Sequence, residues 1–225
     1  MAEHASLNDA LDAEAQGRFV DALKHYLSLL KINPRHEEAL LGVGRVRLLL
    51  GKFDAAVEDF TAVLVGNPLS AEGYRGRGVP FFNKGLIDKA FDDMDKAIGL
   101  APDDLDIRLS RGQIARDLGA LDIAVRDLER AHRLAPHDAD VNLELARCIL
   151  RREDAADRVD EVEALLTVAA RGFGMDDPLI GLLELAVRRL RGATVDKAAI
   201  LAFAAEDEEV ADEVSEIPIL TAIVS

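Results

Sequence analysis

Four of the seven prolines in the chain recur at a fixed interval of 34 residues, at Pro34, Pro68, Pro102 and Pro136. Proline lacks a backbone N–H and clashes with the preceding helical turn, so it closes a helix. A fixed period of this length is the mark of helix–turn–helix repeats. The spacing therefore predicts an all-α solenoid, a class of protein that usually works by holding another protein rather than by chemistry.

Five other sets of residues recur with the same period, and each suits the packing of helix pairs. Glycine suits the turn that ends a helix, and alanine suits a close approach of two helices, where a larger side chain would overpack. A bulky apolar set is expected to fill the gap to the next repeat. The sets are Gly17, Gly51, Gly85 and Gly119; Ala22, Ala56, Ala90 and Ala124; Tyr26, Phe60, Met94 and Leu128; Phe19, Phe53, Ile87 and Leu121; and Ala10, Gly44, Gly78 and Gly112.

Together these sets resemble the tetratricopeptide repeat (TPR) family. The family pattern of small residue, Gly, Ala, aromatic and Pro is matched by Gly44, Gly51, Ala56, Phe60 and Pro68 in the second repeat, and by Gly78, Gly85, Ala90 and Pro102 in the third. The family's first aromatic position departs, since it holds Ser6, Leu40, Tyr74 and Arg108. The resemblance covers four regular repeats over residues 3–138. It implies a right-handed superhelical solenoid of TPR-like repeats with C-terminal capping helices.

Composition narrows the classes of partner and compartment. A formal net charge of −15 argues against nucleic acid or an anionic membrane as the main partner. The single cysteine, Cys148, rules out an intrachain disulfide and gives no metal cluster. The acidic N-terminal stretch lacks the features of a secretory signal, and the apolar runs are too short to span a bilayer. We expect a cytoplasmic protein with no cofactor, no metal site and no membrane insertion.

The period fails after Pro136, and three further segments follow. Residues 139–172 are expected to form a degenerate fifth repeat, and residues 173–205 to form capping helices, of which one begins at Asp177-Pro178 and ends near Leu190. These helices either cover the last repeat or form a dimerisation surface. Residues 206–225 are an acidic run, expected to be solvated and mobile, and then an apolar end. That end either packs on the protein or is a peptide that something binds.

In TPR-like solenoids the first helices of successive repeats line a concave groove, so repeat position predicts its lining. The predicted peptide-binding residues are Leu41, Arg45, Leu48, Arg75, Phe82, Leu109, Gln113, Arg116, Leu143 and Arg147. We expect Gly42, Gly76 and Ser110 to leave room for a ligand backbone. The arginines bind carboxylates with two hydrogen bonds at once, and the leucines and Phe82 bury apolar groups. The predicted ligand is an acidic segment with apolar anchors.

Three alternatives stay open at this point. The arginines either bind such a ligand or pair with acidic neighbours such as Glu38 and Asp117. The acidic and then apolar C-terminal segment matches the predicted ligand, so it either lies elsewhere or occupies the groove of its own or a neighbouring chain. Pro80, inside a predicted first helix, either kinks that helix or is tolerated.

No arrangement of residues points to catalysis. The histidines lack metal-ligand spacing, and Cys148 on an apolar helix face is expected to be a buried structural thiol. We therefore expect a protein–protein interaction adaptor and not an enzyme. The alternative is a structural scaffold that self-assembles through repeat faces or through the C-terminal helix and tail.

Overall fold

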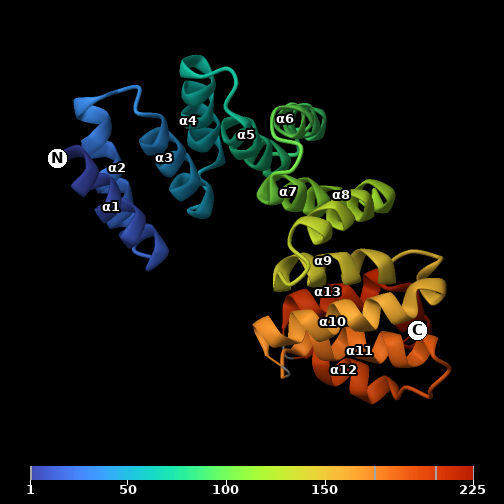
Figure 1. Cartoon of the computed structure of the whole chain (residues 1–225). Coiled ribbons are helices and arrows are strands. Elements are labelled where there is room, and N and C mark those ends of the chain that lie inside the picture. Colours follow the sequence, from blue (N-terminus) through green and yellow to red (C-terminus); the bar gives the residue numbers. More distant parts are fainter. Residues whose placement is uncertain (1, 175, 206, 225) are drawn as a thin grey trace. The chain divides into compact units, whose positions relative to one another are not determined.

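The computed structural model describes residues 2–174, 176–205 and 207–224, with side chains from Leu7 onward. It divides into a first compact unit that ends at Ser110 and a second that begins at Arg111. The helices are α1 (Ala2–Ala15), α2 (Phe19–Ile32), α3 (Glu37–Leu49), α4 (Phe53–Gly66), α5 (Ala71–Asn83), α6 (Ile87–Leu100), α7 (Leu105–Asp117), α8 (Leu121–Leu134), α9 (Ala139–Leu150), η1 (Ala155–Arg158), α10 (Val159–Phe173), α11 (Pro178–Leu190), α12 (Lys197–Ala204), α13 (Glu208–Glu216) and α14 (Pro218–Val224), as Figure 1 shows. The expected all-α fold is confirmed.

The 34-residue period corresponds to antiparallel helix pairs, as predicted. Each periodic glycine lies between the two helices of a pair with a positive φ near +70°, at Gly17, Gly51, Gly85 and Gly119. A side chain there would be strained, so glycine is required by the turn. Each periodic proline lies two residues beyond the end of a second helix, such as Pro34 after α2 and Pro68 after α4.

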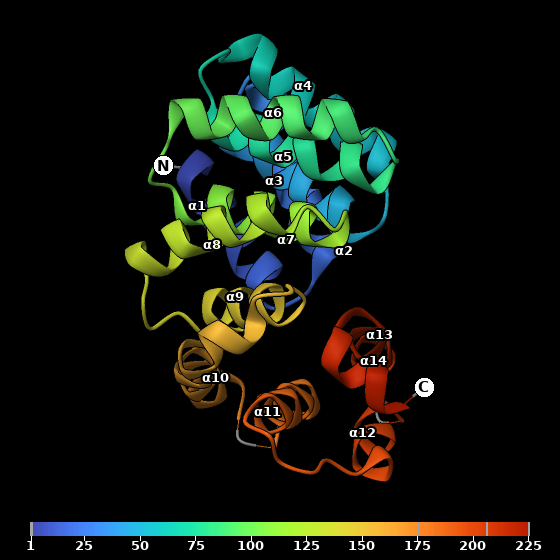
Figure 2. The same ribbon diagram turned by 90° about the vertical axis from the view of Figure 1, so that its right-hand side faces the viewer.

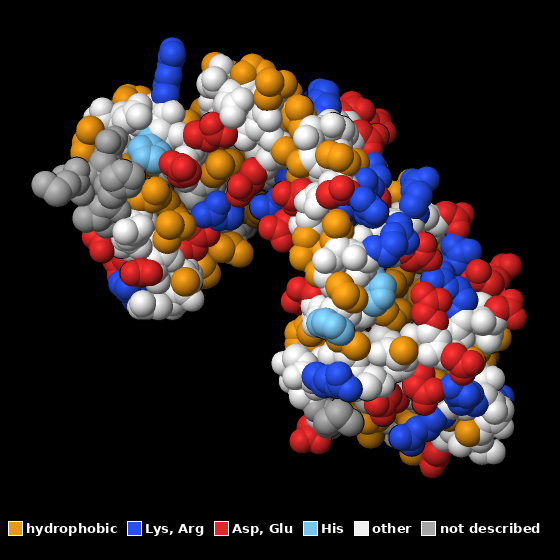
Figure 3. Space-filling model, in the orientation of Figure 1, with side chains coloured by type: hydrophobic (Ala, Val, Ile, Leu, Met, Phe, Trp, Pro, Cys, Tyr) orange, Lys and Arg blue, Asp and Glu red, His pale blue; other side chains and the backbone are white. Residues whose placement is uncertain are grey.

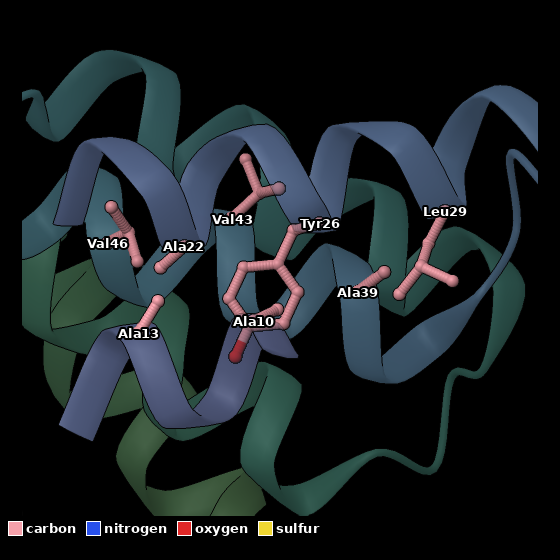
Figure 4. Packing of buried hydrophobic residues seen from close by; sticks show 8 residues of the cluster. All are labelled: Ala10, Ala13, Ala22, Tyr26, Leu29, Ala39, Val43 and Val46. Atoms are coloured by element: carbon pink, nitrogen blue, oxygen red, sulfur yellow. The ribbon is translucent and has the colours of Figure 1, made fainter. Parts of the chain in front are cut away.

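The bulky periodic set forms the core between successive helix pairs. Tyr26 of α2 is fully buried among small residues of α1 and α3, including Ala10 and Ala39 (Figure 4). A Cβ added at Gly42 of α3 would lie 2.3 Å from the ring of Tyr26, and one at Gly76 of α5 would lie 2.3 Å from the ring of Phe60. The expectation that these two glycines leave room for a ligand backbone is therefore wrong, because the preceding repeat fills that room.

Pro80 lies inside α5, and the helix continues through it to Asn83. Its side chain is buried. The missing N–H and the clash with the preceding turn do not end the helix here, although they do so at the periodic prolines.

The C-terminal part of the second unit is helical throughout its described residues. As predicted, α11 begins at Pro178, with the Asp177 side chain accepting a hydrogen bond from the Ile180 N–H at 3.0 Å. The helices α12, α13 and α14 contact one another and α11 (Figure 2). The acidic run forms the helix α13, in which Glu208, Glu209, Asp212 and Glu216 are exposed and Glu213 is buried. The apolar end packs on the protein through Ile217 and Leu220.

Candidate protein-binding faces

The predicted groove residues are treated as two faces, one in each unit. In the first unit, Leu41 is buried with Phe60 and Val63 and belongs to the core rather than to a binding face. The other predicted residues of that unit are partly exposed: Arg45 and Leu48 on α3, Arg75 and Phe82 on α5, and Leu109 on α7. We call Arg45, Leu48, Arg75 and Phe82 the α3–α5 face.

Arg45 is held by acidic residues of its own chain. Its Nε and Nη2 donate to the Glu14 carboxylate at 2.8 and 3.0 Å, and the Tyr26 hydroxyl donates to the same carboxylate at 2.6 Å. Burial alone raises the pKa of Glu14, but the hydrogen bonds from Arg45 and Tyr26 outweigh it, so the pKa lies below its usual value. The hydrogen bond to Glu14 likewise raises the pKa of Arg45.

Glu72 of α5 connects the two arginines of this face with longer contacts. It accepts from Arg45 Nη1 at 3.3 Å and lies 3.5 Å from Arg75 Nη2. Its side chain is 45% exposed, whereas that of Glu14 is 16% exposed. The alternative in which the arginines pair with their own acidic neighbours is thus realised, with Glu14 and Glu72 as the partners of Arg45.

The predicted residues of the second unit surround a denser ion-pair cluster. Arg116 contacts Asp117 at 2.8 Å and also Glu144, and Arg147 contacts Glu144 at 3.4 Å. Gln113 is partly exposed, whereas Leu143 and Arg147 are buried. Neither buried side chain is freely available to a partner. We call Arg116, Arg147 and Arg151 the arginine cluster.

The helix α13 supplies further carboxylates to this cluster. Glu213 contacts Arg147 at 2.7 Å and Arg151 at 2.8 Å, and Glu209 contacts Arg147 at 2.7 Å. Burial lowers the pKa of Arg147, but Glu213 and Glu144 outweigh it and hold the pKa above its usual value. Burial raises the pKa of Glu144 by more than Arg116 and Arg147 lower it. The sequence identified Arg147 and left open that the acidic tail occupies the groove, but it did not identify Glu209 and Glu213 as the residues that contact Arg147.

A second set of ion pairs, which the periodic analysis missed, connects the two helices of single repeats. Arg77 of α5 donates two hydrogen bonds to the Asp93 carboxylate of α6, at 2.7 and 2.9 Å. Arg111 of α7 binds Asp127 of α8 in the same bidentate way, at 2.6 and 2.9 Å. Both carboxylates are buried. The signal was present in the sequence, because these aspartates are 34 residues apart. Their place between paired helices indicates a structural role.

The described residues offer few groups for metal binding or for thiol chemistry. No group of three or more His, Cys, Asp or Glu side chains there has the geometry to hold a metal ion. Cys148 is buried, and burial raises the pKa of its thiol to about 12, which keeps it protonated and unreactive. Of the described helices, none combines the length and apolar character that crossing a membrane needs. Acidic and basic side chains are interspersed over the face shown in Figure 3.

The helix pairs, turn glycines and closing prolines define a helical-repeat protein whose first helices carry the candidate faces. A family model described as tetratricopeptide repeat matches residues 7–60, 44–104 and 109–178. The chain therefore belongs to the tetratricopeptide repeat family, whose members generally mediate protein–protein interaction.

Solved structures of TPR proteins share the fold at low sequence identity. TTC0263, a TPR protein of Thermus thermophilus, is 24% identical, with a TM-score of 0.67 over 85% of this chain and 100% of that one. PilF of Pseudomonas aeruginosa is 16% identical, with a TM-score of 0.73 over 98% and 97%. YrrB, described as a TPR protein with an unusual peptide-binding site, is 13% identical, with a TM-score of 0.60 over 88% and 96%. A search of curated proteins gave no significant match.

Proposed function

We propose that this protein is a cytoplasmic adaptor whose α3–α5 face binds an acidic segment of another protein through apolar anchors. Membership of the TPR family supports the general role, and the peptide-binding site of YrrB shows that the shared fold accommodates one. A single buried cysteine is compatible with a reducing compartment. The choice of the α3–α5 face and of an acidic ligand depends on the side chains of α3 and α5.

The observation that carries this proposal is the position of Glu72. Its carboxylate bridges Arg45 and Arg75 at 3.3 and 3.5 Å, longer than the 2.7–2.9 Å expected of strong charge-assisted pairs. The side chains of Arg45 and Arg75 remain 31% and 22% exposed. Glu72 thus stands where a partner's carboxylate would bind, and its own contacts are weak enough to be exchanged.

Apolar side chains on the same two helices supply the anchor sites. Leu48 and Phe82 are partly exposed, and the neighbouring Leu49 is exposed. Burying such groups against a partner supplies most of the affinity in a typical interface, and charged contacts supply specificity. An acidic partner segment with leucine-like anchors satisfies both sets of side chains.

Affinity purification from the source cells tests this function with matched variants of the full chain. The double variant Arg75→Glu/Leu48→Ala changes the α3–α5 face but leaves the Glu14–Arg45 pair intact. We expect it to recover a specific partner about tenfold less well, as the loss of a charged contact and an apolar anchor implies. Glu72→Gln removes the competing carboxylate and is expected to raise recovery.

The control is Lys24→Glu/Lys31→Glu, which reverses charges exposed on α2 and is expected to leave recovery unchanged. Circular dichroism of each variant establishes that the helices are retained. Equal recovery of every partner by the wild type, the face variant and Glu72→Gln would contradict the proposed function.

A further inference from the structure

We infer that α13 is an internal ligand of the arginine cluster, and that a partner's acidic amphipathic helix must displace it to bind there. The inference rests on the proposed function, because it assigns a second binding face to the same adaptor and a means of regulating it. The partner segment that would bind this second face is defined by the carboxylates and aliphatic side chains that α13 itself presents.

The contacts of Glu213 show how α13 is held. Its carboxylate accepts hydrogen bonds from Arg147 at 3.0 and 2.7 Å and from Arg151 at 3.1 and 2.8 Å. It is 0% exposed. Glu209, one helical turn earlier, accepts from Arg147 Nη1 at 2.7 Å. Residues four apart lie on the same side of a helix, so α13 presents two carboxylates together to the arginines.

The balance of charge explains why this surface selects acidic helices. With α13 in place, Arg147 forms ion pairs with both Glu209 and Glu213, and Arg151 forms an ion pair with Glu213. Without α13, the described acidic contacts of the three arginines are Glu144 and Asp117. The vacated surface carries three arginines against these two carboxylates, so it favours an acidic segment by charge complementarity, although the chain as a whole carries a net charge of −15.

The apolar side of α13 completes the recognition pattern. Val210 and Val214, each next to one of the two glutamates, are buried on the protein. The segment from Glu209 to Val214 thus repeats the pair glutamate–valine after one turn of helix. A partner that competes with α13 needs the same arrangement, with two carboxylates one turn apart and an aliphatic residue after each.

The structure leaves space for a competitor beside α13. A cleft of about 440 Å³ is lined by the arginine cluster and by the α13 residues Glu209, Asp212, Glu213 and Glu216. A second cleft, of about 280 Å³, lies between Arg147 and the beginning of α13 at Glu209 and Val210. The side chains of Glu209 and Glu216 are 62% and 58% exposed. An incoming acidic segment can therefore reach the edges of the cluster before Glu213 leaves.

A synthetic peptide with the sequence of residues 207–224, labelled with fluorescein, is the probe for this competition. Its binding is measured by fluorescence anisotropy against the full wild-type chain and against full-length Glu209→Gln/Glu213→Gln. The variant keeps the valines of α13 but loses the charges that hold it. In the wild type the attached α13 competes at an effective concentration in the millimolar range. We expect the variant to bind the peptide at least about tenfold more tightly.

Two controls fix the site. A peptide in which glutamine replaces Glu209 and Glu213 is expected to bind neither protein measurably. Arg75→Glu, on the α3–α5 face, is expected to leave binding of the acidic peptide unchanged. Loss of binding in Arg75→Glu would overturn the inference while supporting the proposed function, so the two are separately testable. Equal affinity of wild type and variant, or absence of binding to both, would also overturn it.

Hydrogen exchange of the wild-type chain gives a second measurement that needs no variant to fold. Saturating unlabelled acidic peptide is expected to reduce the protection of backbone amides in residues 208–216. Bound peptide with unchanged protection of those amides would show that it binds elsewhere, and would contradict the inference.

Discussion

At the scale of the residue, Glu14 joins three helices of the first unit. Its carboxylate accepts from Arg45 of α3 and Tyr26 of α2 while it belongs to α1. The hydrogen bonds favour the ionised form and depress its pKa from the ordinary value of 4.5. The resulting stabilisation is complete above pH 4.5 and is lost as pH falls through the lower pKa of the folded protein.

Glu14→Gln is therefore expected to lower the free energy of unfolding by about 1 kcal/mol near neutral pH, the scale of a lost charge-assisted hydrogen bond in a partly exposed site. Since glutamine does not titrate, the difference between wild type and variant should close as the pH falls below 4.5. Urea unfolding at a series of pH values measures this. A difference that stays constant with pH would show that the charge of Glu14 is not what stabilises the three helices.

Residue-level patterns predicted much of the core but not its polar contacts. The periodic alanines and bulky residues are buried as expected, because a repeat places equivalent side chains in equivalent surroundings. Gly42 was misassigned to a ligand space because helix position alone does not show that Tyr26 of the preceding repeat covers it. The Glu14–Arg45 pair spans 31 residues rather than 34, so no periodic column reveals it.

At the scale of the element, the paired helices of a repeat are linked by buried ion pairs. Asp127 of α8 is fully buried and binds Arg111 of α7 through both carboxylate oxygens. Asp127→Asn keeps the shape of the side chain but removes the negative charge that Arg111 contacts through both oxygens. Breaking a buried pair in this way costs roughly 3 kcal/mol.

Thermal or urea unfolding of Asp127→Asn measures this cost. The matched control is Asp21→Asn, which removes an aspartate from exposed contacts with Lys24 and Arg18 and is expected to leave stability unchanged within error. Equal stability of Asp127→Asn and wild type would mean that the negative charge of Asp127 does not stabilise the packing of α7 on α8.

The element α13 shows where sequence reasoning reached its limit. Its acidic composition is typical of a solvated run, since isolated carboxylates resist burial. The prediction of solvation does not hold for Glu213, because the compensating arginines, Arg147 and Arg151, lie more than 60 residues earlier in the chain. The sequence shows that the tail is acidic and that the groove carries arginines, so their charges are complementary. Whether the two meet depends on the tertiary fold.

At the scale of the whole molecule, the repeat period predicted the family and the all-α fold, both of which are confirmed. Periodicity specifies the helix pairs one by one, since each packs on its neighbours. It does not specify which carboxylates neutralise the arginines, because those come from two different repeats in the first unit and from the non-repetitive C-terminal helices in the second. The repeat period therefore accounts for the helix pairs of this protein, but not for its ion pairs.

Self-association is the remaining alternative at this scale, and we expect the protein to be a monomer. The tail that would link two copies already satisfies Arg147 and Arg151 within its own chain, and a net charge of −15 repels neighbouring copies. Size-exclusion chromatography with light scattering should give the mass of one chain, 24.4 kDa, over a range of concentrations. Salt, which screens the repulsion, should leave that mass unchanged.

A mass that rises with concentration and persists in salt would instead favour the self-assembling scaffold. The exposed residues Val65 and Leu69 are the first to examine in that event, because they are 79% and 73% exposed near the end of α4. If Val65→Ser/Leu69→Ser restored the single-chain mass, association would run through those exposed apolar residues. If Glu209→Gln/Glu213→Gln restored it, α13 would be exchanged between chains, and the arginine cluster would bind the tail of a neighbour rather than its own.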